Sequence, residues 1–186
     1  RPDSDTVSAA LRSFMRLSDP QPARCDTAIG QAMWLLRLVQ TNSVSLDIAG
    51  AVFIKCHSPG ATYELLHNRR DSLTPTQEVA FLKSLFLTGR PTEYWNRRLQ
   101  VANKIPPDPE LELCHTAYLA GWGPAETLTP ARRKLEEAQN DPMFRTMACR
   151  LEMLVAAKLQ EPASCQRALQ RLQEDRSDRV QDYAAY

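Results

Sequence analysis

Apolar side chains recur at helical spacing along most of the chain. Between residues 108 and 142, Leu111, Cys114 and Tyr118 fall about one turn apart, and Leu135 and Ala138 continue the pattern further on. This spacing places the apolar groups on one helix face that can be buried. No segment shows sustained alternation of apolar and polar residues. The pattern therefore predicts helices rather than strands.

Prolines and glycines divide the helical stretches into pairs of similar length. Pro75, Pro109 and Pro142 each stand where the first helix of a pair should begin, and they are 34 and 33 residues apart. A single helix pair cannot cover its own apolar face, so such pairs must stack. We therefore predict an all-α fold of about five stacked antiparallel helix hairpins. It should form a single domain over residues 1–186, with residues 1–4 and 174–186 frayed.

The same spacing predicts which side chains are buried. A helix over residues 23–40 is apolar almost all round in its second half, so it should lie centrally. The buried stripe in the helix before residue 105 is expected to be Trp95, Leu99 and Ala102. Other expected core positions are Leu65, Leu66, Leu151, Leu154, Val155, Cys165, Ala168, Leu169 and Leu172.

The unit from Pro109 resembles the tetratricopeptide repeat class. Ala131, Leu135 and Ala138 coincide with the small and bulky positions of that family's second helix, and its closing proline lies within one residue of Pro142. The first helix departs from the family pattern: His115, Tyr118 and Leu119 stand where the family has Trp, Leu and Gly. The resemblance implies a right-handed, protein-binding superhelix with a concave face lined by first helices.

Nothing in the sequence indicates catalysis. The chain has no motif for a nucleotide, a zinc ion or a nucleophilic serine, and its three histidines are scattered. Cys114 and His115 cannot form a catalytic pair with each other, because adjacent residues on a helix point about 100° apart. Disulfides between Cys114 and Cys149 or between Cys149 and Cys165 are disfavoured alternatives to free thiols. We expect no enzyme activity, no cofactor and no metal.

Charge and cysteine content bear on location. The net charge is +1, and no uncharged apolar run approaches the roughly 18 residues needed to cross a bilayer. The five cysteines include no C-x-x-C pair and look like buried thiols, which favours the cytoplasm. The chain begins at Arg1 without Met, so an exported or periplasmic domain, or a domain of a longer protein, is the alternative.

The predicted function is protein binding by surface shape. An adaptor or chaperone-like module would hold a peptide or helix of another protein in the groove lined by first helices. By analogy alone, bacterial secretion, pilus or envelope assembly would suit such a module. Trp122, between two glycines, is the expected exposed anchor. The other candidate partner-binding residues are Gln77, Lys83, His115, Tyr118, Arg145 and Arg150.

The alternative function is nucleic-acid binding through arginines on the second helices. Arg97, Arg98, Arg132, Arg133 and Arg167 recur at 35-residue spacing, and stacking would align them as a basic ladder for phosphate or acidic groups. The favoured interpretation is a solvated face that Glu93, Glu136 and Glu137 neutralise locally.

Overall fold

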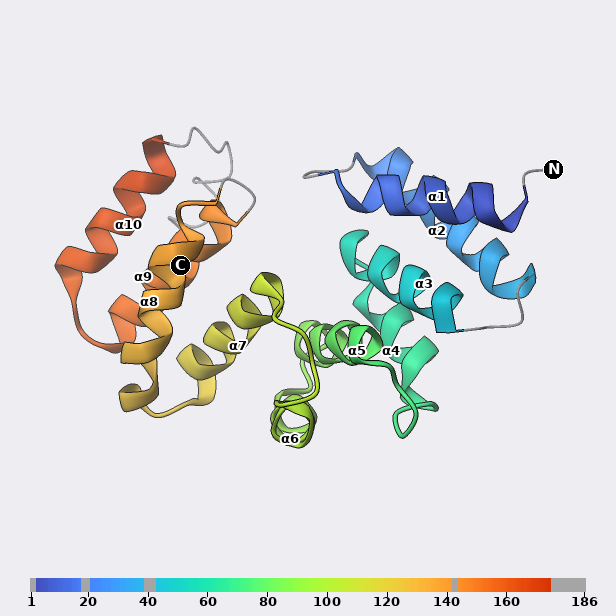
Figure 1. Ribbon diagram of the computed structural model, residues 1–186. Coiled ribbons are helices and arrows are strands. Elements are labelled where there is room, and N and C mark those ends of the chain that lie inside the picture. Colours follow the sequence, from blue (N-terminus) through green and yellow to red (C-terminus); the bar gives the residue numbers. More distant parts are fainter. Residues whose placement is uncertain (1–2, 18–20, 39–42, 142–143, 175–186) are drawn as a thin grey trace. The chain divides into compact units, whose positions relative to one another are not determined.

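The computed structural model describes residues 3–17, 21–38, 43–141 and 144–174, and within these ranges it contains helices and no strand. The chain groups into two compact units, residues 1–107 and residues 108–186, whereas the sequence predicted one domain. Within each unit, a helix turns back to pack against the helix that precedes it in the chain (Figure 1). Unit 1 contains α1 (Ser4–Met15), α2 (Pro22–Leu38), α3 (Ser43–Lys55), α4 (Pro59–His67), α5 (Pro75–Leu87) and α6 (Pro91–Val101). Unit 2 contains α7 (Pro109–Trp122), the short 3₁₀ helix η1 (Ala125–Thr127), α8 (Leu128–Ala138), α9 (Arg145–Lys158) and α10 (Pro162–Glu174).

The ten described α-helices form five consecutive hairpins, as the period of the prolines predicted. In unit 1, α3 packs against α1 and α2 of the hairpin before it, and α5 packs against α3 and α4. In unit 2, α9 packs in the same way against α7 and α8. Each unit is therefore a stack of antiparallel hairpins. Pro75 and Pro109 begin their helices, whereas Pro142 lies outside the described residues.

Three of the hairpins have turns of the same type. The first helix ends at a residue with left-handed backbone, namely His57 (φ 54), Gly89 (φ 71) or Gln160 (φ 58). The next N–H then donates to the carbonyl five residues back, for example from Ser58 to Phe53 at 2.8 Å, which closes the helix in a Schellman motif. The residue after that is a proline, which begins the second helix in all three cases.

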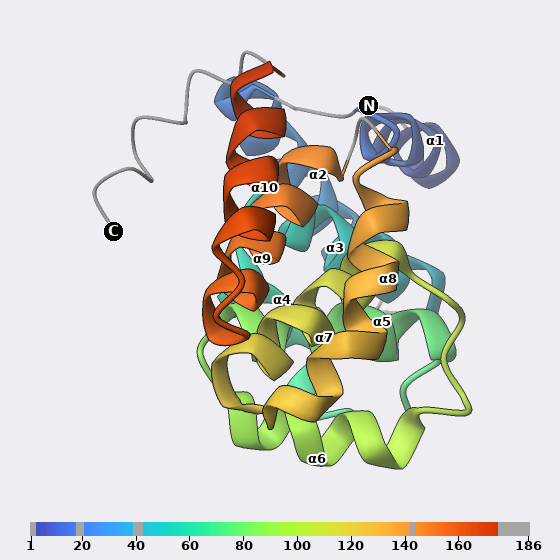
Figure 2. The ribbon, with the colours of Figure 1, turned by 90° about the vertical axis from the view of Figure 1, so that its left-hand side faces the viewer.

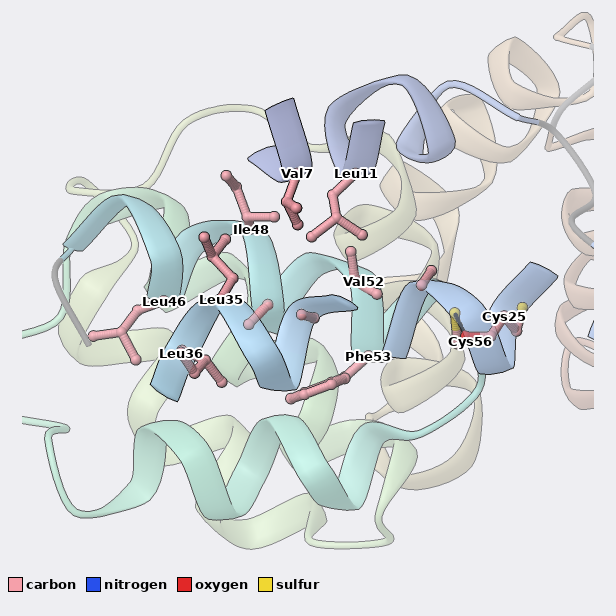
Figure 3. Packing of buried hydrophobic residues seen from close by; sticks show 13 residues of the cluster. Val7, Leu11, Cys25, Leu35, Leu36, Leu46, Ile48, Val52, Phe53 and Cys56 are labelled. Carbon is pink, nitrogen blue, oxygen red and sulfur yellow. Dashed lines mark hydrogen bonds between the residues drawn. The ribbon is translucent and has the colours of Figure 1, made fainter. Parts of the chain in front are cut away.

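The core of unit 1 lies between α1, α2 and α3. Val7 and Leu11 of α1 point toward Ile48 and Val52 of α3, and Leu35 of α2 lies beside them (Figure 3). All five side chains are buried. Because α1 is amphipathic and contributes one narrow stripe, this core holds α1 onto the hairpins that follow.

The core of unit 2 surrounds α9, with α8 and α10 running alongside it (Figure 2). Leu111, Leu128, Leu135, Cys149 and Val155 are fully or almost fully buried there. The predicted burial of Leu135 and Val155 is thus confirmed. No described helix combines the length and the apolar character that a bilayer crossing needs.

At several positions the burial of the side chain differs from the prediction. On α6 the buried residues are Tyr94 and Val101, while Trp95 is half-buried and Leu99 is 60% exposed. Tyr94 packs edge-on against Phe86 with ring centroids 5.7 Å apart, so the face one residue earlier meets α5. The other exceptions, at which neighbouring residues occupy the core, are Leu65 and Cys165, which are half-buried, and Ala102, Leu154 and Leu169, which are exposed.

Candidate partner-binding surface

Three of the predicted partner-binding residues form one row on α7. His115, Tyr118 and Trp122 are spaced three and four residues apart, so their side chains follow one helix face. The His115 and Tyr118 rings are nearly parallel, with centroids 6.5 Å apart, and the Tyr118 and Trp122 rings are 5.7 Å apart. His115 and Tyr118 are half-buried, whereas Trp122 is 61% exposed. We refer to these three residues as the aromatic row.

Buried residues of α7 in line with the row and on either side of it fix the row in place. Leu111, Cys114 and Leu119 are buried in the core of unit 2. At its N-terminus, the Asp108 carboxylate accepts a hydrogen bond from the Leu111 N–H at 2.7 Å, which satisfies one of the N–H groups that the first turn leaves unbonded. The helix therefore presents the aromatic row from a well-anchored scaffold.

Lys158 of α9 holds the C-terminal end of α7. Its ammonium group donates to the backbone carbonyls of Leu119 at 3.3 Å, Ala120 at 3.0 Å and Gly123 at 2.6 Å. The last carbonyls of a helix lack donors within the helix, and a cation there also complements the helix dipole. Lys158 thus hydrogen-bonds to three carbonyl groups of the segment that contains Trp122.

Gly123 is needed at this end because of close packing. A Cβ atom built there would lie 2.9 Å from the Cα atom and the carbonyl oxygen of Leu119. The Gly123 N–H also donates to that carbonyl at 2.9 Å. Any larger residue would push the chain away from the end of α7, so Gly123 and Lys158 together set the position of Trp122.

Two predicted partner-binding residues are not on the surface. Gln77 is 3% exposed, and its side-chain amide donates to Asp47 at 2.7 Å while its carbonyl oxygen accepts from the Thr74 N–H. Lys83 is buried as well. The expectation that they line an open groove is wrong, because α5 is covered by α3, α4 and α6 and is buried throughout its middle.

Arg145 and Arg150 lie on α9 and are half-buried. The Nε group of Arg145 donates to the backbone carbonyl of Gln139 at 3.0 Å, which ties α9 to the end of α8. The structure therefore gives Arg145 an internal partner. Neither arginine belongs to the aromatic row.

The arginines of the predicted basic ladder divide between the two units. In unit 1, Arg97 of α6 binds the Glu78 carboxylate of α5 with its Nε group at 3.0 Å, and Arg98 is half-buried. Glu93, expected to neutralise this region, pairs instead with Arg90 at 2.9 Å. The charge of Arg97 is thus neutralised by a carboxylate from another helix.

In unit 2, Arg132 is paired on both sides. Its guanidinium contacts Glu152 of α9 at 2.8 Å and Glu161 at 2.6 Å, whereas the exposed Arg133 pairs with Glu137 at 3.5 Å. The Glu161 hydrogen bond raises the pKa of Arg132, and Arg132 lowers the pKa of Glu161. Burial raises the pKa of Glu152, against the opposing effect of Arg132. Local neutralisation is confirmed for Glu137.

The thiols and potential metal ligands give no sign of a reactive centre in the described part of the chain. All five cysteines are free, and no group of three potential metal ligands occurs among the described residues. Burial and the neighbouring Cys25 raise the pKa of Cys56 to about 12. Its thiol stays protonated at neutral pH, which makes it a poor nucleophile.

Sequence reasoning missed Lys158 and the close contact between Gly123 and Leu119, because these contacts are identified only once the chain has folded. The three residues of the aromatic row could be found, since their spacing follows one helix face. No family model, no curated protein and no solved structure matches this chain.

Proposed function

We propose that the protein is a non-catalytic binding module that holds an apolar segment of another protein against the aromatic row of α7. The observation that carries this proposal is Trp122, a large apolar ring 61% exposed at the end of a stacked row. Tryptophan and tyrosine are enriched among the residues that dominate binding energy at protein interfaces.

The magnitude matches that of a residue that dominates the binding energy of an interface. A tryptophan side chain buries about 150 to 250 Å² when covered, so the exposed part of Trp122 presents on the order of 120 Å². At about 25 cal/mol per Å², covering that area contributes about 3 kcal/mol. Since 1.4 kcal/mol corresponds to a factor of ten, Trp122 alone can account for about two orders of magnitude in affinity.

The spacing of the row suits a helical or extended partner segment. From His115 to Trp122 the row follows two turns of α7, or about 10 Å. Two or three apolar side chains of a partner helix, one turn apart, match that length. The resemblance to tetratricopeptide repeats supports the same proposal, because α7 is the first helix of its hairpin and first helices line the binding face in that family.

The nucleic-acid alternative receives less support from the contacts. Arg97 and Arg132 of the basic ladder are bonded to internal carboxylates. Phosphate contacts would require those guanidinium groups to exchange their partners. Binding to single-stranded RNA that weakens steeply with added salt would favour the nucleic-acid function over the protein-binding one.

The test is selection of peptides from a random phage-displayed library on the immobilised protein. The selected peptides should carry apolar residues, and Trp122→Ala should weaken their binding at least tenfold in fluorescence anisotropy titrations. Leu99→Ala is the matched control, because Leu99 is equally exposed at 60% but lies on α6. Peptides that bind parent and Trp122→Ala equally well would reject the aromatic row as the binding surface.

A further inference from the structure

Two arginines of the predicted ladder meet in a pocket of unit 2. The pocket has a volume of about 240 Å³ and lies between α8, α9 and α10. Arg132 and Glu152 line it together with Ser164, Arg167 and Arg171. Three guanidinium groups thus face one small polar cavity.

The arginines in this pocket have unequal partners. Arg132 is neutralised by Glu152 and Glu161. Arg167 donates to the Ser164 hydroxyl at 2.9 Å, and Arg171 donates to the Gln139 side-chain carbonyl; both acceptors are uncharged. Neither of these two guanidinium groups is therefore hydrogen-bonded to a carboxylate here, and Glu161 acts on Arg167 through electrostatic attraction. Arg167 and Arg171 are also one turn apart on the same helix, a like-charge arrangement that destabilises a helix unless an anion lies nearby.

The inner wall of the pocket is built from buried polar groups. Gln139, Glu152 and Ser164 are each more than nine-tenths buried, and the Ser164 hydroxyl donates to Glu161 at 2.9 Å. Gln139 and Ser164 hold the two α10 guanidinium groups in defined positions. The exposed Glu136 also lines the pocket, so with Glu152 and Glu161 three carboxylates accompany the three arginines, two of them paired with Arg132.

We propose that Arg167 and Arg171 bind an oxyanion, namely a phosphate or carboxylate group carried on a small polar molecule. Guanidinium groups match the planar geometry of such oxygens and form charge-assisted hydrogen bonds with them. The cavity is larger than the anion itself, so it also admits the polar body that bears the charged group. The proposal is independent of the aromatic row.

The test titrates the intact protein with sodium phosphate and, separately, with sodium acetate, at constant ionic strength held with sodium chloride. NMR observation of the arginine Nε–Hε signals should show two signals that shift, each assigned by its loss in Arg167→Gln or Arg171→Gln. At ten times the dissociation constant the melting temperature should rise by about 3 to 6 °C. A stronger effect of phosphate assigns a phosphate group, and a stronger effect of acetate assigns a carboxylate.

The matched control is Arg133→Gln. It removes the same charge from α8, but Arg133 is strongly exposed and pairs with Glu137 outside the pocket. The proposal predicts that Arg133→Gln keeps the full response to the anion, whereas Arg167→Gln and Arg171→Gln each reduce the affinity at least tenfold. Absence of any shift in the parent protein, or equal losses in all three variants, would overturn the proposal.

Discussion

Replacing Lys158 by Met removes the charge that closes the C-terminal end of α7 while keeping a side chain of similar length. The parent ammonium group donates to three carbonyls, those of Leu119, Ala120 and Gly123. Methionine cannot donate to any of them. The substitution therefore isolates the contribution of the ammonium group to the stability of unit 2 and to the position of Trp122.

The expected loss is about 2 to 3 kcal/mol in the free energy of unfolding. A hydrogen bond involving a charged group contributes about 1.5 to 3 kcal/mol. The three bonds do not add fully, because one ammonium group is desolvated once for all of them. Water also reaches part of this helix end, since Gly121 and Trp122 are exposed.

Urea denaturation followed by circular dichroism measures the loss. Fluorescence anisotropy in a background with Trp34→Phe and Trp95→Phe reports on Trp122 alone, and it should fall in Lys158→Met as the ring gains freedom. Lys134→Met is the control: its salt bridge with Glu112 also joins two helices, but its side chain is 59% exposed, so its removal should cost less than about 1 kcal/mol. Equal stability of the two variants, with unchanged anisotropy, would refute the role assigned to Lys158.

Two further predictions concern the core and the buried carboxylate. Leu135→Ala should lower the free energy of unfolding by about 2 to 5 kcal/mol, since Leu135 is fully buried. Leu99→Ala on the surface of α6 should change it by less than about 0.5 kcal/mol. Urea denaturation measures both changes, and similar values for the two variants would contradict the assigned burial. Because burial raises the pKa of Glu152 above 4.5 in the folded state, the folded chain retains a proton that the unfolded chain has released. That group's contribution to stability should therefore fall as pH rises above 4.5, and Glu152→Gln should remove this dependence; identical pH profiles for parent and variant would count against it.

The hairpins could be predicted because their boundaries are encoded locally. Proline is the first residue of α5 and α7, at the positions that the repeat period indicated. The shared turn was less visible, since only Gly89 among its three left-handed residues is a glycine. His57 and Gln160 adopt a backbone conformation that side chains usually disfavour, so composition did not reveal them.

The burial of individual side chains was harder to predict than the hairpin boundaries, because it depends on which neighbours cover a helix. On α6 the stripes through Tyr94 and through Trp95 are both apolar enough to pack, and only contact with α5 selects Tyr94. On α5 the polar residues Gln77 and Lys83 are enclosed because other helices surround it. A helical period identifies faces, but it does not say how many of them are covered.

The aromatic row lies on a hairpin whose turn differs from the one that three other described hairpins have in common. The turns at His57, Gly89 and Gln160 each lead into the next helix within two residues. In contrast, α7 ends at the extended Gly123, and η1 comes before α8 begins at Leu128. The connection to the next helix is longer here, and the Lys158 cation from α9 adds to the single backbone hydrogen bond that Gly123 donates at the end of α7. Departures from a local rule are expected where function needs them. The exposure of Trp122 at this particular turn therefore supports the proposal that a partner binds at α7.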